Sequence, residues 1–211
     1  MSLSWRSRLL LALYPDRVVW LQAAKGLHPR ITAKSSVSCT VDKAMPWRGA
    51  LSVLPEVLRT AQASGMRVTA ILSNRLLRYA LVPNPDSARS REELDLLARH
   101  AFARAHGDTV ANWDIRLSDA ASGQPALASA VDRELIVTLR ETIVASGARL
   151  VSIQPYLMAA FNHLNRGRRI RNGIFVLVEP ERLSLLAWKQ EGWCGVQQVY
   201  ATNDWMDSLH G

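Results

Sequence analysis

Three consecutive strand-like segments occur near each end of the chain, and this repetition limits the folds that the chain can form. The two sets lie at residues 9–13, 18–23 and 31–41, and at residues 174–178, 183–188 and 196–201. In each set a short turn containing proline separates the first two segments, which predicts a β-hairpin. Meander strands followed by alternating helices and strands are typical of a mixed sheet. Because the second set repeats the first, we expect a duplicated α/β architecture whose second copy is cut short.

Between the two sets, helical and strand-like segments alternate. Ser90 and Glu93 match a capping box, which predicts a helix that runs to His106. Pro55 interrupts the apolar pattern of residues 47–64, so we expect a kink or a new helix start there. The other predicted strands and helices lie at residues 67–73, 76–82, 113–117, 126–131 and 149–153, and at residues 132–146 and 155–165.

The composition is that of a globular protein with an excess of positive charge. Apolar residues make up 48% of the 211 residues, and the net charge is +8. The longest early apolar run, residues 9–14, is too short for a membrane span and precedes no cleavage site, so we expect no targeting segment.

The densest run of positive charge is the arginine-rich stretch formed by Arg166, Arg168, Arg169 and Arg171. It is compatible with a solvated loop, with a face for an anionic membrane or acidic partner, or with a nucleic-acid site. No regularly spaced aromatic residues accompany it, so nucleic acid is the least favoured partner.

The sequence lacks the residue patterns of common catalytic and metal sites. It contains no glycine-rich phosphate-binding motif, and its five histidines show no metal-ligand spacing. Cys39 and Cys194 are far apart, which favours two buried thiols in a reducing compartment. A two-metal nuclease of the ribonuclease-H type needs acidic residues on its first strand, and residues 9–13 contain none. We therefore expect no catalytic residue, no metal and no cofactor.

Three stretches of the sequence carry a resemblance to a known group of proteins. They are residues 127–131, residues 150–161 and residues 71–83, the last with the pattern Leu-Ser-Asn-x-x-x-Arg-Tyr that ends at Tyr79. In these stretches the chain resembles the actin-like fold, and more narrowly the PilM-type and GspL-type cytoplasmic proteins of type IV pilus assembly and secretion, including the agglutinin-pilus biogenesis group. The resemblance covers roughly residues 9–200. It implies a first ribonuclease-H-like lobe at residues 1–82 and 132–170, an inserted subdomain at 83–131, and a truncated second lobe at 171–211.

The resemblance also implies a scaffold role beneath the inner membrane. Such proteins are cytoplasmic, lie peripheral to that membrane, and bind the cytoplasmic tail of a bitopic assembly protein in a groove beside the inserted subdomain. Arg75, Arg78 and Tyr79 are the first candidates for that groove, and Tyr156 and Asn162 extend the set. The alternative interpretation places Arg78 in water on an edge strand and Tyr79 in the core.

Three tryptophans lie in or near the last predicted strands: Trp188, Trp193 and Trp205. They are interpreted either as core or lobe-interface residues or as part of an apolar surface that an incomplete lobe leaves open. Such a surface would serve docking or dimerisation, so a homodimer is left open as a further partner.

The resemblance fails at the two phosphate-binding motifs of actin-like ATPases. The acidic, glycine and basic positions of the first motif fall on Ala12, Tyr14 and Val19. In the second motif, the acidic and glycine positions fall on Val178 and Pro180, and only Ser184 keeps a hydroxyl. Proline lacks the N–H that would bind phosphate, so we expect a pseudo-ATPase. Two alternatives remain: an ATP-binding actin-like protein with a divergent site, and a basic nucleic-acid-binding module.

Overall fold

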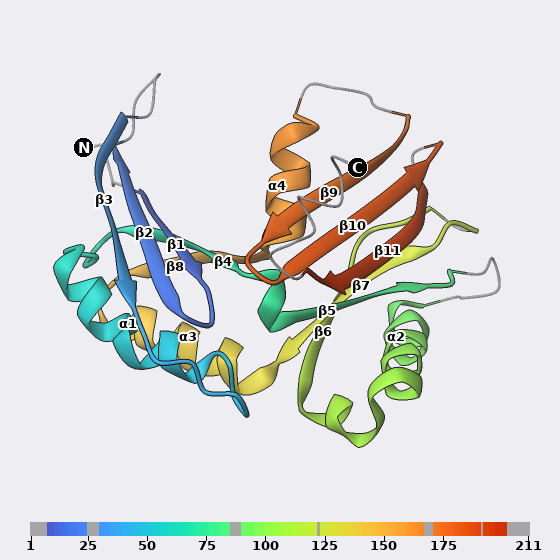
Figure 1. Cartoon of the computed structure of the whole chain (residues 1–211), viewed down its shortest axis with the longest axis horizontal. Coiled ribbons are helices and arrows are strands. Elements are labelled where there is room, and N and C mark those ends of the chain that lie inside the picture. The colour runs from blue at the N-terminus through green and yellow to red at the C-terminus, as the bar shows by residue number, and fades with distance from the viewer. Residues whose placement is uncertain are drawn as a thin grey trace. The chain divides into compact units, whose positions relative to one another are not determined.

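The computed structural model describes residues 8–24, 30–84, 90–121, 123–166, 171–190 and 192–201. Its elements follow the predicted order, with three strands at the start, helices alternating with strands, and three strands at the end (Figure 1). This order confirms the predicted α/β class with a mixed sheet. Contacts divide the chain into two compact units, which are Met1–Leu76 with Arg133–Tyr156, and Leu77–Asp132 with Leu157–Gly211.

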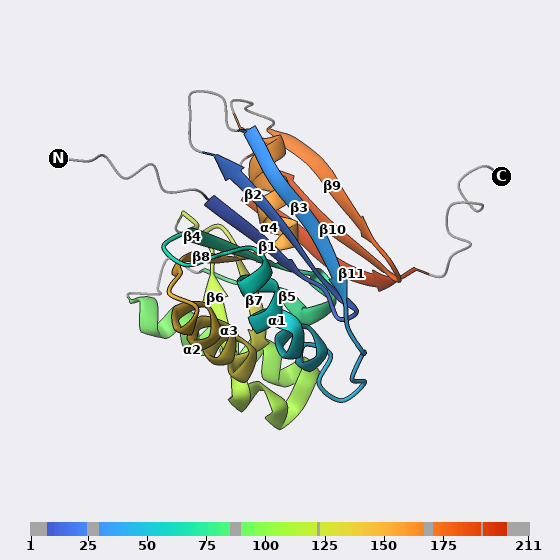
Figure 2. The same cartoon turned by 90° about the vertical axis from the view of Figure 1, so that its left-hand side faces the viewer.

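A five-stranded mixed sheet forms the centre of the first unit. Its strand order is β3 (Arg30–Ser38), β2 (Arg17–Ala24), β1 (Arg8–Leu13), β4 (Arg67–Leu72) and β8 (Arg149–Pro155). β1 pairs antiparallel with β2 and parallel with β4, and β4 pairs parallel with β8. Parallel neighbours need crossover connections. Helices α1 (Arg48–Thr60) and α3 (Arg133–Ala145) precede β4 and β8 and lie side by side against the sheet (Figure 1, Figure 2).

The core of the first unit follows from the two periodicities of its elements. Alternation along β1 buries Leu9, Leu11 and Leu13, each of which is at most 1% exposed. Each helix contributes one apolar face, made by residues three or four positions apart. The buried helix residues include Leu51, Leu54 and Leu58 of α1 and Leu135, Leu139 and Ile143 of α3.

The first helix corrects two predictions. Pro55 does not start a new helix, because α1 continues through it. Leu54 and Leu58 are buried on either side of Pro55, so the packing of one face stabilises the helix although proline removes a backbone donor. The helix also ends at Thr60, before the predicted end at residue 64, and Gln62 then turns the chain with a φ of 47°.

Two three-stranded antiparallel sheets belong to the second unit. In the first of these sheets the strand order is β5 (Leu77–Val82), β7 (Ala126–Asp132) and β6 (Trp113–Leu117). In the second it is β11 (Gly192–Tyr200), β10 (Arg182–Lys189) and β9 (Asn172–Glu179). Helix α2 (Arg91–His106) and the short helix η2 (Gly107–Asn112) pack on the first sheet, and α4 (Tyr156–Leu164) packs on the second. Strand β11 also packs beside β5, which brings the two sheets together within this unit.

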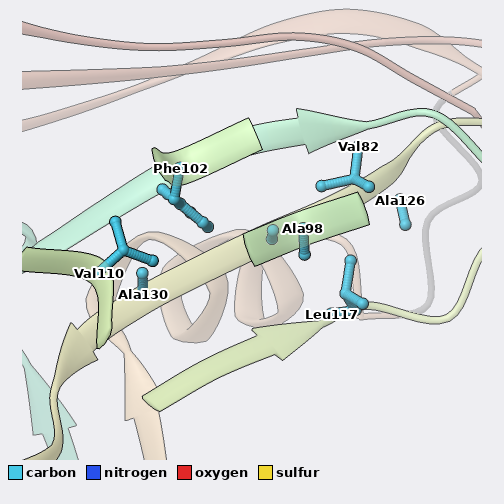
Figure 3. Packing of buried hydrophobic residues seen from close by; sticks show 8 residues of the cluster. Val82, Ala98, Phe102, Val110, Leu117, Ala126 and Ala130 are labelled. Atoms are coloured by element: carbon cyan, nitrogen blue, oxygen red, sulfur yellow. The ribbon is translucent and has the colours of Figure 1, made fainter. Parts of the chain in front are cut away.

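Small residues let α2 approach its sheet closely. Ala98 and Phe102 of this helix meet Val82, Ala126 and Ala130 of the strands (Figure 3). At the start of the helix, the Ser90 side chain accepts a hydrogen bond from the Glu93 N–H at 3.2 Å. The serine half of the predicted capping box is therefore confirmed.

An aromatic cluster forms the core beneath α4. The ring of Phe161 lies 5.0 Å from Trp188, 5.2 Å from Trp193 and 5.9 Å from Phe175, measured between ring centroids. Trp188 is only 7% exposed, as the core interpretation predicted. Trp205 lies outside the described residues.

The prediction of two buried thiols is wrong. Cys194 is exposed and Cys39 is half-buried. Cys194 follows Trp193, which packs in the core, and it lies where the register of the β10–β11 ladder shifts, so its side chain lies on the outward face of β11. Burial raises the pKa of the Cys39 thiol, and the negative charge of Asp16 raises it further.

The predicted division into lobes stays a prediction. In the observed units, residues 77–132, which contain the predicted insertion, group with the last three strands.

Across the described residues, His, Cys, Asp and Glu side chains form no cluster of three or more that could hold a metal ion. None of the helices in the described part of the chain combines the length and the apolar composition that a membrane crossing requires.

Candidate functional site

The turn between β1 and β2 is closed by its own side chains. The Tyr14 N–H donates to the Arg17 carbonyl at 2.9 Å, and the Arg17 guanidinium lies over the Tyr14 ring, 4.6 Å from its centroid. Arg17 forms an ion pair with Asp16 at 3.0 Å, and Arg75 of the short helix η1 (Asn74–Leu76) approaches the same carboxylate at 3.9 Å. Arg75, predicted to contact a partner, therefore lies beside Asp16.

The turn between β9 and β10 is equally unlike a phosphate-binding loop. Pro180 and Glu181 connect the two strands, and Glu181 has a φ of 61°, in the left-handed region that glycine adopts most easily. Pro180 has no N–H to donate. A phosphate-binding loop presents a row of backbone N–H groups, whereas the Tyr14 N–H is used within the first turn and Pro180 of the second turn has none.

The face of the β9–β10–β11 sheet that carries Trp188 becomes polar toward this turn. Cross-strand partners in an antiparallel sheet share a face. The last two cross-strand rows on this face are Leu177, Ser184 and Gln198, and then Glu179, Arg182 and Tyr200. Glu179 and Arg182 are only 4% and 9% exposed, whereas Tyr200 is 78% exposed.

Arg182 and Ser184 bring unused hydrogen-bonding capacity to this face. The guanidinium of Arg182 lies 4.4 Å from the centroid of the Tyr200 ring, in a cation–π contact. Its buried Nε makes no hydrogen bond with any described residue, and neither does the buried Oγ of Ser184. Buried polar atoms in folded proteins are nearly always hydrogen-bonded, so this pair is unusual.

Strand β5 carries two of the predicted partner residues, Arg78 and Tyr79, whose side chains as strand neighbours leave opposite faces of the sheet. Arg78 donates to the Leu77 carbonyl at 2.9 Å. Burial lowers the pKa of Arg78, and the nearby positive charge of Arg182 lowers it further. Burial also raises the pKa of Tyr79 well above its usual range, and the charge of Glu179 adds to that rise. Tyr79 is therefore a neutral phenol at physiological pH.

The polar residues of this sheet face, together with the two β5 residues whose pKa values respond to their charges, are called the arginine cluster. Its members are Arg78, Tyr79, Glu179, Arg182, Ser184 and Tyr200. Two guanidinium groups and one carboxylate give it a formal charge of one positive unit.

The predicted partner residues divide between the two units. Arg75 and Tyr156 belong to the first unit, and Arg78, Tyr79 and Asn162 belong to the second. The groove that would gather all of them stays a prediction. Asn162 is exposed on α4.

Two residues of the predicted basic surface lie in the described part of the chain. Arg166 and Arg171 are both exposed, whereas Arg168 and Arg169 lie outside the described residues.

Sequence reasoning missed Glu179, Arg182 and Tyr200. One local signal was available, because the alternation of β10 places Arg182 on the same face as Ser184 and Trp188. An arginine on the buried face of a strand is uncommon and points to a polar site. Its neighbours could not be read from this signal, because they come from other strands.

Comparison with known proteins identifies the fold. No protein-family model and no curated protein matches the sequence. The cytoplasmic domain of EpsL, an inner membrane component of the type II secretion system of Vibrio cholerae, matches with a TM-score of 0.65 and 15% identity, over 96% of this chain and 74% of that one. The PilM–PilN type IV pilus biogenesis complex matches with a TM-score of 0.66 and 15% identity, over 95% and 63%. A Bacteroides thetaiotaomicron protein with an actin-like ATPase fold matches with a TM-score of 0.63 and 11% identity, over 98% and 75%.

The chain therefore has the actin-like fold. The resemblance to PilM-type and GspL-type proteins, predicted from three sequence stretches, is confirmed at the level of the fold. The chain spans between 63% and 75% of the length of these three matched chains.

Proposed function

We propose that this protein is a non-catalytic, actin-like scaffold of type IV pilus or related secretion machinery. It binds the cytoplasmic tail of an inner-membrane assembly protein and lies in the cytoplasm, peripheral to the membrane. The observation that carries this proposal is the fold, which is shared with an EpsL cytoplasmic domain and with a PilM–PilN complex. The predicted partner residues Arg78 and Tyr79 lie in the arginine cluster, which supports a binding role.

The two hairpin turns support binding without ATP hydrolysis. Asp16 is the one carboxylate of the first turn, and it lies within ion-pair distance of Arg17 and Arg75. A magnesium–phosphate site needs a carboxylate that is available to the cation. The second turn offers Pro180 and the left-handed Glu181 in place of glycines. The buried hydroxyl of Ser184 favours one second candidate function, a divergent nucleotide site.

A binding assay with membrane-protein tails tests the proposal. The cytoplasmic tails of the inner-membrane proteins encoded beside this chain would be made as labelled peptides, and binding would be followed by fluorescence anisotropy. We expect one tail to bind with a dissociation constant of about 1–100 μM, as for other small, transient interfaces. A scrambled peptide of the same composition is the control and should not bind.

Two outcomes would contradict the proposal. One is the failure of every tail to bind protein that is folded by circular dichroism. The other is a rise in melting temperature with ATP and magnesium, because a ligand that binds only the folded state stabilises it. The second outcome would favour the divergent nucleotide site.

A further inference from the structure

The arginine cluster contains two polar atoms whose hydrogen-bonding capacity the described residues leave unused. These are Nε of Arg182 and Oγ of Ser184. Arg182 is 9% exposed and Ser184 is 0% exposed, and the two residues occupy successive inward positions of β10. Buried atoms without a partner also occur singly elsewhere in the described residues, but here two of them lie on one strand face, and each adds an unfavourable desolvation term unless a bound molecule pairs with it. A site that a ligand completes gives a reason for this arrangement.

The donors and charges nearby limit the chemistry of that ligand. Nε of Arg182 can only donate a hydrogen bond, and the Ser184 hydroxyl can donate one as well. The ligand therefore supplies acceptors. Arg78 adds a second positive charge, and the charge of Arg182 is one cause, after burial, of its lowered pKa. An anion bound at Arg182 would offset the effect of this charge on Arg78.

The charge of the cluster favours an anion with a single charge. The cluster carries one positive unit in excess, because Glu179 offsets one of its two arginines. Glu179 is also buried and lies directly across from Arg182 in the ladder. A carboxylate balances the excess, whereas a phosphate with nearly two charges would make the cluster negative and would be repelled about twice as strongly by Glu179.

We propose that the arginine cluster binds one carboxylate, that of an Asp or Glu side chain in the partner's tail, through Nε of Arg182 and the hydroxyl of Ser184. Arg78 supplies the second positive charge. The Tyr200 ring lies against the Arg182 guanidinium and holds this planar group in place. The identity of the peptide rests on the proposed function, whereas the carboxylate site itself does not.

The experiment is a titration of the full chain with sodium acetate, followed by nuclear magnetic resonance of the arginine Nε–Hε groups. We expect a saturable shift of the Arg182 signal with acetate, and no such shift with sodium chloride at the same ionic strength. An equal response to chloride would mean screening only and would overturn the proposal. A parallel titration with inorganic phosphate tests the charge argument, and tighter binding of phosphate than of acetate would overturn the assignment to a carboxylate.

Ser184→Ala is the decisive variant, because it removes one proposed ligand contact without changing any charge. We expect acetate binding to weaken about three- to tenfold, which is the loss of one hydrogen bond. We also expect no loss of melting temperature, because the deleted hydroxyl has no hydrogen-bond partner among the described residues. Unchanged acetate binding would overturn the proposal, and so would a marked fall in melting temperature, which would assign the hydroxyl a structural role.

Arg182→Gln should abolish acetate binding, with Arg140→Gln as its matched control. Arg140 is exposed on α3 and belongs to the other compact unit, so its substitution changes the net charge equally without altering the arginine cluster. If a tail peptide binds the wild type and the Ser184→Ala and Arg182→Gln variants equally, the carboxylate site is wrong and the proposed function stands. If acetate binds as expected but no tail does, the proposed function is wrong and the site stands.

Discussion

Gly65 and Gly147 have the same backbone geometry in different surroundings. Their φ angles are 74° and 76°, and the Gly65 N–H donates to the Gly147 carbonyl at 2.9 Å. A Cβ added at Gly65 would meet no atom within 4 Å, whereas one at Gly147 would meet Oγ of Ser64 at 2.9 Å. The two positions therefore separate the cost of a left-handed backbone from the cost of a steric clash.

This difference gives a prediction about stability. Gly65→Ala should lower the free energy of unfolding by about 1–2 kcal/mol, the usual cost of a left-handed conformation for a residue with a Cβ. Gly147→Ala should lower it further, because its Cβ also displaces the Ser64 hydroxyl. In a Ser64→Ala background the extra cost should disappear. Urea denaturation followed by circular dichroism measures each value, and equal costs of both substitutions in the wild type would contradict the argument.

Helix α2 shows how a whole element is specified by its first turn. Ser90 has an extended backbone, with φ −143° and ψ 161°, and its side chain caps the Glu93 N–H. Glu92 and Glu93 place negative charge at the positive end of the helix dipole. Hydrogen bonds from its own backbone N–H and from Ser90 lower the pKa of Glu92. Three local interactions therefore favour a helix start at this position.

Removal of the cap gives a prediction for this element. Ser90→Ala should lower the free energy of unfolding by about 1 kcal/mol, and Ser90→Asp should preserve it, because aspartate is an equally good cap. Because the pKa of Glu92 is lowered in the folded state, its charge contributes to the stability of the protein, and this contribution is lost as the pH falls through that pKa. Ser90→Ala removes one of the hydrogen bonds that lower this pKa, so the stability of the variant should fall less on acidification than that of the wild type.

Ser52→Ala is the matched control for the cap, since Ser52 is an exposed serine inside α1 where alanine is the better helix former. Thermal and urea denaturation would compare the variants. A Ser90→Ala protein as stable as the Ser52→Ala protein would contradict the capping role.

The charge of the whole molecule bears on where it works. The chain carries 26 Lys and Arg against 18 Asp and Glu, a net charge of +8. Inner leaflets that contain anionic lipids attract such a protein, and the attraction is screened by salt over about 10 Å at 0.1 M. A peripheral position beneath the membrane, as proposed, is consistent with this charge.

Vesicle binding is the prediction at this scale. The protein should co-sediment with vesicles that contain about 30% phosphatidylglycerol at low salt, because several basic residues near an anionic surface each contribute about 1 kcal/mol. Binding should fall steeply at about 0.5 M sodium chloride, where the screening length is a few ångströms. Neutral phosphatidylcholine vesicles are the control. Equal binding to neutral vesicles, or none to anionic vesicles at low salt, would remove the membrane surface from the proposed partners.

The order of elements could be predicted because each signal is local. The alternation of Leu9, Leu11 and Leu13 and the cap at Ser90 each depend on residues within one strand or one turn. The predictions failed where tertiary packing outweighs a local preference. The new helix start at Pro55, one of the two outcomes expected there, failed because neighbouring leucines are buried in α1, and the burial expected of Cys194 failed because it lies on the outward face of β11.

The sequence by itself determined the α/β order of strands and helices, and it determined that the two hairpin turns have no glycines for a phosphate. Periodicity, caps and turn residues act over a few positions, so they can be read along the chain. Only the tertiary structure decided that Arg78 lies near Arg182 and that Tyr200 covers the Arg182 guanidinium. These contacts depend on strand register and on the packing of β11 beside β5, which join residues far apart in the chain and leave no local pattern.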